Sequence, residues 1–142
     1  MREGFEFPCW FAGRGRVPAG AVSDHVWAFW DFLPTAAELA GARPPEETDG
    51  LSILPVLLGG EAVEHEYLYW EFYERGGAQA VRMGDWKAVR KWREGLPTEL
   101  YHLGEDPGET HDLAAEYPEV VAKMEAIMES ARFDNENYKK PD

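Results

Sequence analysis

Four features are scarce in this 142-residue sequence, and each scarcity excludes a class of protein. The single cysteine, Cys9, excludes an internal disulfide, and cysteine and histidine never cluster at metal-binding spacing. No apolar run reaches the roughly 18 residues that mark a membrane span. Lysine and arginine total only 14 against 27 aspartates and glutamates, a formal net charge of -13. Nucleic acid and anionic membrane surfaces would therefore be repelled.

The apolar content, by contrast, is ample for a folded domain. The chain is 44% hydrophobic and 13% aromatic, and its length suits one domain with a core. The opening residues MREGFEFPCW carry an acid at position 3 and lack the apolar centre of a signal peptide. The sequence thus predicts a globular chain in which we expect no targeting signal, and it does not indicate the cellular compartment.

The first 50 residues predict an incomplete structural unit. Glycines and prolines make residues 1–24 a loop, and the β-favouring run Val26–Phe32 predicts a strand buried on both faces, with a buried helix start as the alternative. Good helix formers after Pro34 predict a short helix from about Leu33 to Ala40, ended by Gly41. A strand and a helix are half of a βαβ unit, so we expect a remnant of a larger α/β domain.

The pattern changes after residue 50 and predicts an antiparallel meander. An apolar segment ends at Gly59–Gly60, and four short strands follow, EYLYWEF, AQAVRM, WKAVRKW and TELYHL. Turns at Gly76–Gly77, at Gly84–Asp85 and in EGLP (residues 94–97) separate them. Such a sheet has one packed and one wet face.

A C-terminal helix is predicted to cover the packed face. It begins with Pro118, and its apolar residues are spaced by three and four up to Ala131. The fold class is therefore α+β: a four-stranded antiparallel meander packed on a C-terminal helix and preceded by the strand-helix remnant. We divide the chain into the remnant (1–50), a subdomain (51–133) and a polar tail (134–142).

Candidate catalytic residues are few, and each has a structural alternative. Cys9 has no identifiable base beside it, which favours an incidental thiol over a nucleophile. The four histidines stand apart, which disfavours a metal site; they are His25, His65, His102 and His111. Glu71 and Glu74 beside a hairpin turn suggest an acid–base pair, but solvent-facing acids are commoner there.

The charged and aromatic residues of the hairpins are also open to two interpretations. A basic patch could contact an anionic substrate or pair with Glu71, Glu74 and Glu99; it comprises Lys87, Arg90, Lys91 and Arg93. Trp86 and Trp92 are expected to build the core or its rim. The segment GRGR at 13–16 is too short for a phosphate cradle. The residues themselves predict no assembled catalytic site.

Four motifs, in order along the chain, carry a resemblance to a known family. They are SDHVWAFWDFLPTAAELAG with the pattern D-x-x-PT-x-x-x-x-AG, DGLSILPVLLGG with DG-x-S-x-x-P-x-L-x-G, the hairpin YWEF with QAVRMGDWKAVR, and ELYHLGEDPGETHDLA. Together they cover about residues 16–132 and resemble the C-terminal part of bacterial arylsulfatase-like enzymes of the alkaline phosphatase superfamily. His102 stands where that family usually has aspartate, and Asp112 where it usually has asparagine. Residues 1–20 resemble the preceding segment less well, with Phe5 and Gly13 as departures.

The resemblance implies sulfate-ester hydrolysis by a formylglycine, formed within C-x-P-x-R, beside a calcium ion. Cys9 is followed by Trp-Phe-Ala-Gly and so lacks that motif. We expect calcium and formylglycine only in a missing N-terminal catalytic domain, and no cofactor in this chain, which would be a truncated piece of a sulfatase. In family terms the hairpin is chiefly scaffold, and its first turn gives candidate substrate-pocket residues: Tyr73, Glu74, Gln79 and Arg82.

Three functional hypotheses follow. In the first, the chain is a sulfatase C-terminal subdomain, inactive alone, that completes the fold and shapes access of a sulfated small molecule or glycan. In the second, it is a binding or assembly module that pairs with a separate partner through residues 26–32. The third and weakest is a free-standing hydrolase using Cys9, or Glu71 and Glu74. The exposed apolar strand also predicts self-association. Full-length relatives are often periplasmic or secreted.

Overall fold

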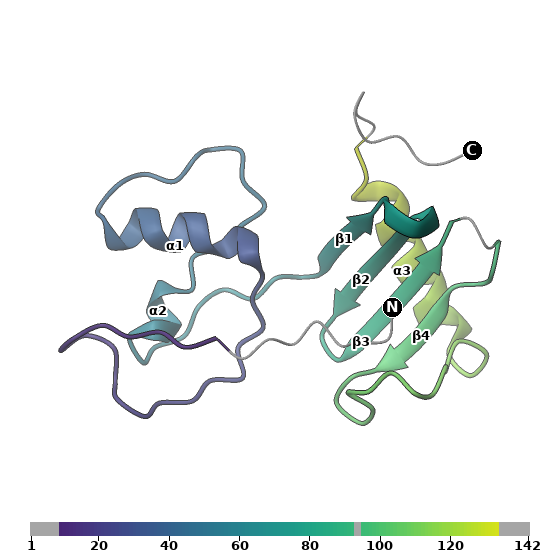
Figure 1. Ribbon diagram of the computed structural model, residues 1–142, viewed down its shortest axis with the longest axis horizontal. Helices are drawn as coiled ribbons and strands as arrows, with labels where there is room; N and C mark the ends of the chain where they lie inside the picture. The colour runs from purple at the N-terminus through teal and green to yellow at the C-terminus, as the bar shows by residue number, and fades with distance from the viewer. Residues whose placement is uncertain (1–8, 93–94, 134–142) are drawn as a thin grey trace. The chain divides into compact units, whose positions relative to one another are not determined.

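The computed structural model describes residues 9–92 and 95–133, which form two compact units (Figure 1). The N-terminal unit ends at His65, and the C-terminal unit begins at Glu66. Four predicted features lie wholly or partly outside the described residues: the start of the loop 1–24, the start of the third turn at Glu94, Arg93 of the basic patch, and the tail 134–142.

The C-terminal unit contains the predicted meander. Its strands are β1 (Leu68–Phe72), β2 (Ala78–Met83), β3 (Trp86–Lys91) and β4 (Glu99–His102), and each is antiparallel to the next, in the order β1-β2-β3-β4. In the register, Val81 lies opposite Ala88, which lies opposite Leu100. Gly84 has a φ of 57°, a left-handed conformation that suits glycine in the two-residue turn between β2 and β3. The α+β prediction is confirmed.

The helix α3 (Pro118–Ser130) lies across one face of this sheet, as predicted (Figure 1). Its first residue, Pro118, lacks a backbone N–H, which costs nothing in the first turn of a helix. The centre of the core has no solvent exposure and consists of Val81, Ala88, Leu100, Met124 and Met128. Val120, Val121 and Ile127 pack around it. Full burial of a side chain as large as Val81, Leu100 or Met124 contributes about 1.5–3 kcal/mol.

The loop between β4 and α3 is fixed by its own carboxylates. The Asp106 side chain accepts hydrogen bonds from the backbone N–H of Thr110 (2.6 Å) and His111 (2.8 Å), which lower the pKa of this carboxyl. Asp112 Oδ1 accepts the Leu100 N–H at 3.0 Å. Asp112 therefore holds the loop to β4 with its carboxylate oxygen, an acceptor that asparagine also has.

In the N-terminal unit, the predicted strand Val26–Phe32 is wrong. A 3-10 helix, η1 (Phe29–Asp31), leads directly into α1 (Phe32–Leu39). A buried strand needs neighbouring strands to bond its backbone, and no strand occurs among the described residues of this unit. Instead, the Asp31 carboxylate accepts the Ala28 N–H at 2.7 Å and turns the chain. The predicted helix, placed at about Leu33 to Ala40, is confirmed within one residue.

Asp31 also ties α1 to the segment before the short helix α2 (Leu54–Leu57). Its carboxylate is fully buried, accepts the Leu51 N–H at 2.8 Å, and lies 2.8 Å from His65 Nε2. Thr35 Oγ1 accepts the Ile53 N–H at 3.0 Å. Three separate segments are therefore joined through polar groups rather than through a large apolar core.

Gly50, in the same unit, is required by close packing. A Cβ atom at this position would lie 2.2 Å from the carbonyl oxygen of Trp30, a distance that no real contact reaches. One structural role is thus shared by Asp31, Thr35 and Gly50, which come from the first two of the four motifs. They hold η1 and α1 against the segment that precedes α2.

Candidate functional site

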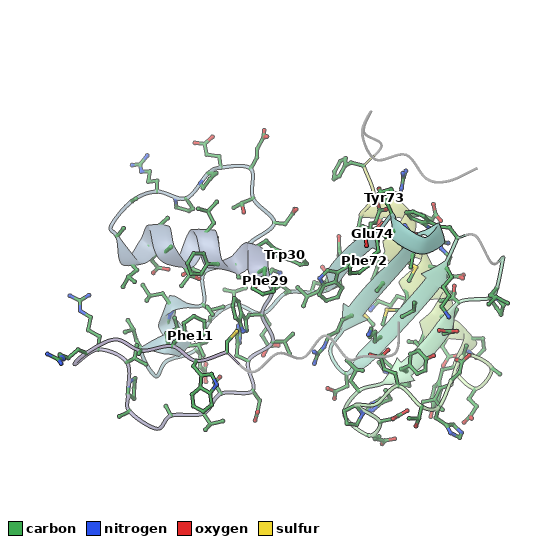
Figure 2. All side chains as sticks on the ribbon, in the orientation of Figure 1. Phe11, Phe29, Trp30, Phe72, Tyr73 and Glu74 are labelled. Carbon is green, nitrogen blue, oxygen red and sulfur yellow. The ribbon has the colours of Figure 1, made fainter. Side chains whose placement is uncertain are left out.

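The turn between β1 and β2 lies above a network of side-chain hydrogen bonds. The turn consists of Tyr73, the 3-10 helix η2 (Glu74–Gly76) and Gly77, and Figure 2 shows Tyr73 and Glu74 at this end of the sheet. Gly76 and Gly77 have φ angles of 104° and 79°, which favour glycine. A Cβ atom on Gly77 would also lie 2.2 Å from the Trp92 ring, so the ring packs directly on the turn backbone.

Glu71 on β1 gathers the side chains beneath this turn. The hydroxyls of Tyr69 and Tyr73 donate to its two carboxylate oxygens, and Arg132 Nε lies 3.1 Å from Oε1. Burial, followed by the hydrogen bond to Glu71, raises the pKa of both tyrosines. Both hydroxyls therefore remain protonated donors at neutral pH, and Glu71 serves as their common acceptor.

Gln79 on β2 is the second centre of this network and is only 1% exposed. Its Oε1 accepts from Arg90 Nη2 at 2.6 Å, Arg90 Nε at 3.1 Å and Trp92 Nε1 at 2.9 Å. Its Nε2 donates to Tyr69 Oη at 2.7 Å and to Met128 O at 3.3 Å, and lies 3.3 Å from Glu71. The amide thus connects three strands to the end of α3 and leaves no donor or acceptor for a ligand.

The four predicted pocket residues are only partly brought together. Tyr73 and Glu74 lie in the turn, and Gln79 lies beneath it on the face that carries α3. Arg82 is three residues beyond Gln79 on the same strand, so it faces the opposite side of the sheet, and its Nε donates to Gly84 O at 3.1 Å.

The basic patch pairs with carboxylates, partly as predicted. Lys91 pairs with Glu99 across the strands at 3.0 Å, which confirms the predicted cross-strand alternative at this position. Arg90 instead pairs with Glu129 of α3 at 2.6 Å. Lys87 pairs with Glu109, and both side chains are almost fully buried.

The remaining sequence candidates are scattered. Cys9 is an exposed free thiol. His65 is held by Asp31, and the His102 ring packs edge-on against Trp86 with centroids 4.7 Å apart. Trp86 packs against the core, as predicted. Among the described residues, no group of three or more histidine, cysteine, aspartate or glutamate side chains could hold a metal ion.

Sequence reasoning named Gln79 as a pocket candidate but missed its burial, and it missed the buried pair of Lys87 and Glu109. Gln79 lies between Ala78 and Ala80 in a strand, and an inward polar residue among small neighbours was the available signal. Glu109 and Lys87 are 22 residues apart, and no local pattern relates them. In the described ranges, no helix has the length and apolar character needed to cross a membrane.

Comparisons with known proteins agree on the family. The family model of the N-sulphoglucosamine sulphohydrolase C-terminal domain matches residues 1–134. The N-acetylgalactosamine-6-sulfatase of Canis lupus familiaris is 31% identical over 81% of this chain and 28% of its own length. The delta 4,5-hexuronate-2-O-sulfatase of Bacteroides thetaiotaomicron is 32% identical over 86% of this chain and 27% of its own length. The chain thus spans less than a third of these relatives.

Solved structures show the same relationship. Ps i-CgsB superimposes with a TM-score of 0.74 at 31% identity, covering 86% of this chain and 28% of that protein. Its structure with k-i-k-neocarrahexaose gives a TM-score of 0.64 at 29% identity, covering 75% of this chain and 24% of that protein. The four motifs, the sheet with its covering helix and the family match lead to one conclusion. The chain belongs to the sulfatase family, and to its C-terminal domain in particular.

Proposed function

We propose that this chain is the C-terminal subdomain of a sulfatase, inactive alone, which completes the enzyme's fold and shapes the access of a sulfated sugar. Residues 1–50 belong to the large α/β domain in this proposal, residues 51–133 form the subdomain, and residues 134–142 form a tail. The relatives are more than three times as long as their matched part, which supports a catalytic domain elsewhere.

The observation that carries this proposal is the apolar surface around the start of α1. Phe29 is 79% exposed, Phe32 60% and Leu33 52%, and these residues are consecutive or nearly so (Figure 2 labels Phe29). Apolar patches of this kind mark surfaces that another protein surface covers. The sulfatase catalytic domain is the partner that the family match supports.

The chain's own residues do not fit the cofactors of such an enzyme. Cys9 lacks the C-x-P-x-R context, and the described residues hold no candidate metal group. We therefore assign calcium and formylglycine to the catalytic domain and no chemical step to this chain.

Substrate access is assigned to the turn between β1 and β2. Tyr73 and Glu74 are the residues proposed to face the sugar, with Gln79 beneath them and Arg82 on the strand that follows the turn. The related Ps i-CgsB has been crystallised in complex with k-i-k-neocarrahexaose, and this complex supports a glycan as the substrate class.

Hydrolysis of a chromogenic aryl sulfate with calcium present tests this proposal. The purified chain alone should show no turnover. A chimera that joins the catalytic part of the Bacteroides thetaiotaomicron 2-O-sulfatase to this chain should hydrolyse a 2-O-sulfated delta 4,5-hexuronate. Turnover by the isolated chain, lost on Cys9→Ala or Glu71→Gln, would instead favour the free-standing hydrolase.

The same surface supports a second candidate, an assembly module that pairs with a separate partner through residues 26–32. The solution mass of the chain, alone and mixed with the catalytic part of the relative, separates the two. A specific one-to-one complex favours the module, whereas self-association that disappears only in the covalent chimera favours the subdomain.

A further inference from the structure

Gln79 and Glu71 lie under the turn, but neither has a polar atom left over to bind a ligand. Gln79 is 1% exposed and its amide is used entirely by Arg90, Trp92, Tyr69, Glu71 and Met128. Both oxygens of Glu71 are engaged by tyrosine hydroxyls. Neither residue is therefore available to contact a substrate directly. Their effect on a ligand must pass through the side chains that they hold.

Among the side chains that they hold are two aromatic rings that meet at the turn, Tyr73 in the turn itself and Trp92 just after β3. Glu71 accepts from the Tyr73 hydroxyl, and Gln79 accepts from the Trp92 indole N–H at 2.9 Å. The two rings meet edge to face with centroids 5.4 Å apart, and Gly77 lies against Trp92. Each ring is thus fixed at its polar end by a different polar centre, and the two centres are themselves bonded to each other.

We propose that Glu71 and Gln79 are positioning residues, which set the orientation of Tyr73 and Trp92 for contact with the ring of a sulfated sugar. This inference rests on the proposed function. Half-buried aromatic rings suit a sugar, because its C–H faces pack on the face of the ring while the polar tips of Tyr73 and Trp92 stay bonded to Glu71 and Gln79. Binding energy depends on such rings being held in place before the ligand arrives.

The chemistry of the Gln79 position supports positioning over simple core filling. Burying an amide costs free energy unless every group is hydrogen-bonded, and an apolar residue would fill the same space without that cost. The neighbouring inward position on β2 is Val81, which is fully buried in the apolar core. A fully satisfied polar network instead fixes one arrangement of its members.

The first test measures orientation in the 142-residue chain by nuclear magnetic resonance. Gln79→Met and Glu71→Gln should abolish or weaken the ring-to-ring contact of Tyr73 and Trp92, while the methyl signals of Val81 and Leu100 stay in place. Tyr73→Phe deletes only the hydroxyl that donates to Glu71. It serves as the milder variant if Gln79→Met or Glu71→Gln fails to fold. Glu99→Gln removes the negative charge of the Lys91–Glu99 pair in the same sheet and is the control. Unchanged ring contacts in all three variants would overturn the proposal.

The second test measures kinetics in the chimera described above. Gln79→Met should raise KM for the 2-O-sulfated hexuronate about tenfold, the equivalent of 1.4 kcal/mol of binding, with kcat little changed. A merely structural role would lower the amount of active enzyme and leave KM alone. An inactive unsubstituted chimera would refute the proposed function, whereas an active one with an unaltered KM in Gln79→Met would refute this inference only.

Discussion

The two units differ in how they are held together. The C-terminal unit has five apolar residues with no exposure at the centre of its sheet and helix. The N-terminal unit buries few of its described apolar residues, among them Ala28 and Ile53, and it leaves Trp10 and Phe29 largely in solvent. One unit is stabilised by hydrophobic packing, and the other by the hydrogen bonds around Asp31.

This difference shows which unit has the means to be stable by itself. A sheet of four strands with a covering helix satisfies its backbone and buries an apolar face. Two short helices linked by a buried carboxylate bury too little apolar surface to offset the entropy of ordering some 57 residues, at roughly 1–2 kcal/mol each. We therefore expect the N-terminal unit to unfold first, and the following substitutions probe that contrast in order of decreasing effect.

The largest effect is expected at the buried ion pair of the C-terminal unit. Lys87→Met leaves the Glu109 carboxylate, 3% exposed, without its charged partner, which should lower the free energy of unfolding by about 3–5 kcal/mol. Urea denaturation followed by circular dichroism measures it. Lys91→Met at the more exposed pair with Glu99 is the control and should cost about 1 kcal/mol or less. Equal costs at the two positions would contradict the burial argument.

A smaller effect is expected from the apolar core itself. Leu100→Ala removes a side chain with no exposure and should cost about 2–5 kcal/mol by urea denaturation. The matched substitution in the N-terminal unit is Leu39→Ala, at a leucine that is 58% exposed, and should cost about 0.5 kcal/mol or less. A larger cost at Leu39 than at Leu100 would reverse the comparison.

Asp31→Asn should weaken the N-terminal unit selectively. Asp31 Oδ2 accepts from the backbone N–H of Ala28, and Oδ1 accepts from that of Leu51. Because asparagine has only one side-chain oxygen, one of these two N–H groups loses its acceptor, at a cost of about 1–3 kcal/mol. Hydrogen exchange should accelerate in the N-terminal unit and stay unchanged in the sheet. Asp49→Asn, at an exposed aspartate, is the control. Acceleration across both units would show that they unfold together.

The smallest effect is a pH dependence at Tyr101. Burial, and then Glu99, raises the pKa of Tyr101 from 10.0 to about 12. The folded state holds the Tyr101 proton more tightly than the unfolded state. The contribution of Tyr101 to the free energy of unfolding is therefore fully present below about pH 10 and is lost as the pH rises towards 12. Urea denaturation between pH 9 and pH 12, spanning the ordinary tyrosine range near 10, should show a shallower decline for Tyr101→Phe than for the natural chain. Identical slopes would exclude this tyrosine as a contributor.

The sequence predicted the C-terminal unit far better than the N-terminal one. Glycine pairs and alternating residues define short strands locally, so the meander and α3 could be read directly. The run Val26–Phe32 is also rich in β-favouring residues, but a strand needs neighbouring strands, and a local pattern does not report them. The aspartate at its end decided the outcome, through backbone bonds to Ala28 and to Leu51, which is twenty residues away.

The polar network beneath the turn was predictable only in some of its members. Tyr73 and Gln79 were singled out through the family resemblance, but the sequence does not reveal which groups Gln79 meets on the face of the sheet that carries α3. The partner that explains this orientation, the carbonyl of Met128, is 49 residues away. Arg82 illustrates the converse, since a residue only three positions along the same strand points to the other face.

The contact between His65 and Asp31 determines where the chain can be divided in the laboratory. His65 is the final residue of the N-terminal unit, and β1 begins only three residues later, at Leu68. A gene fragment that starts at residue 51 would carry His65 away from its carboxylate and leave Asp31 behind. A fragment that starts at Glu66 would leave Asp31 and its partners Ala28, Leu51 and His65 together on the other side of the cut. It is therefore the better choice for expressing the sheet alone.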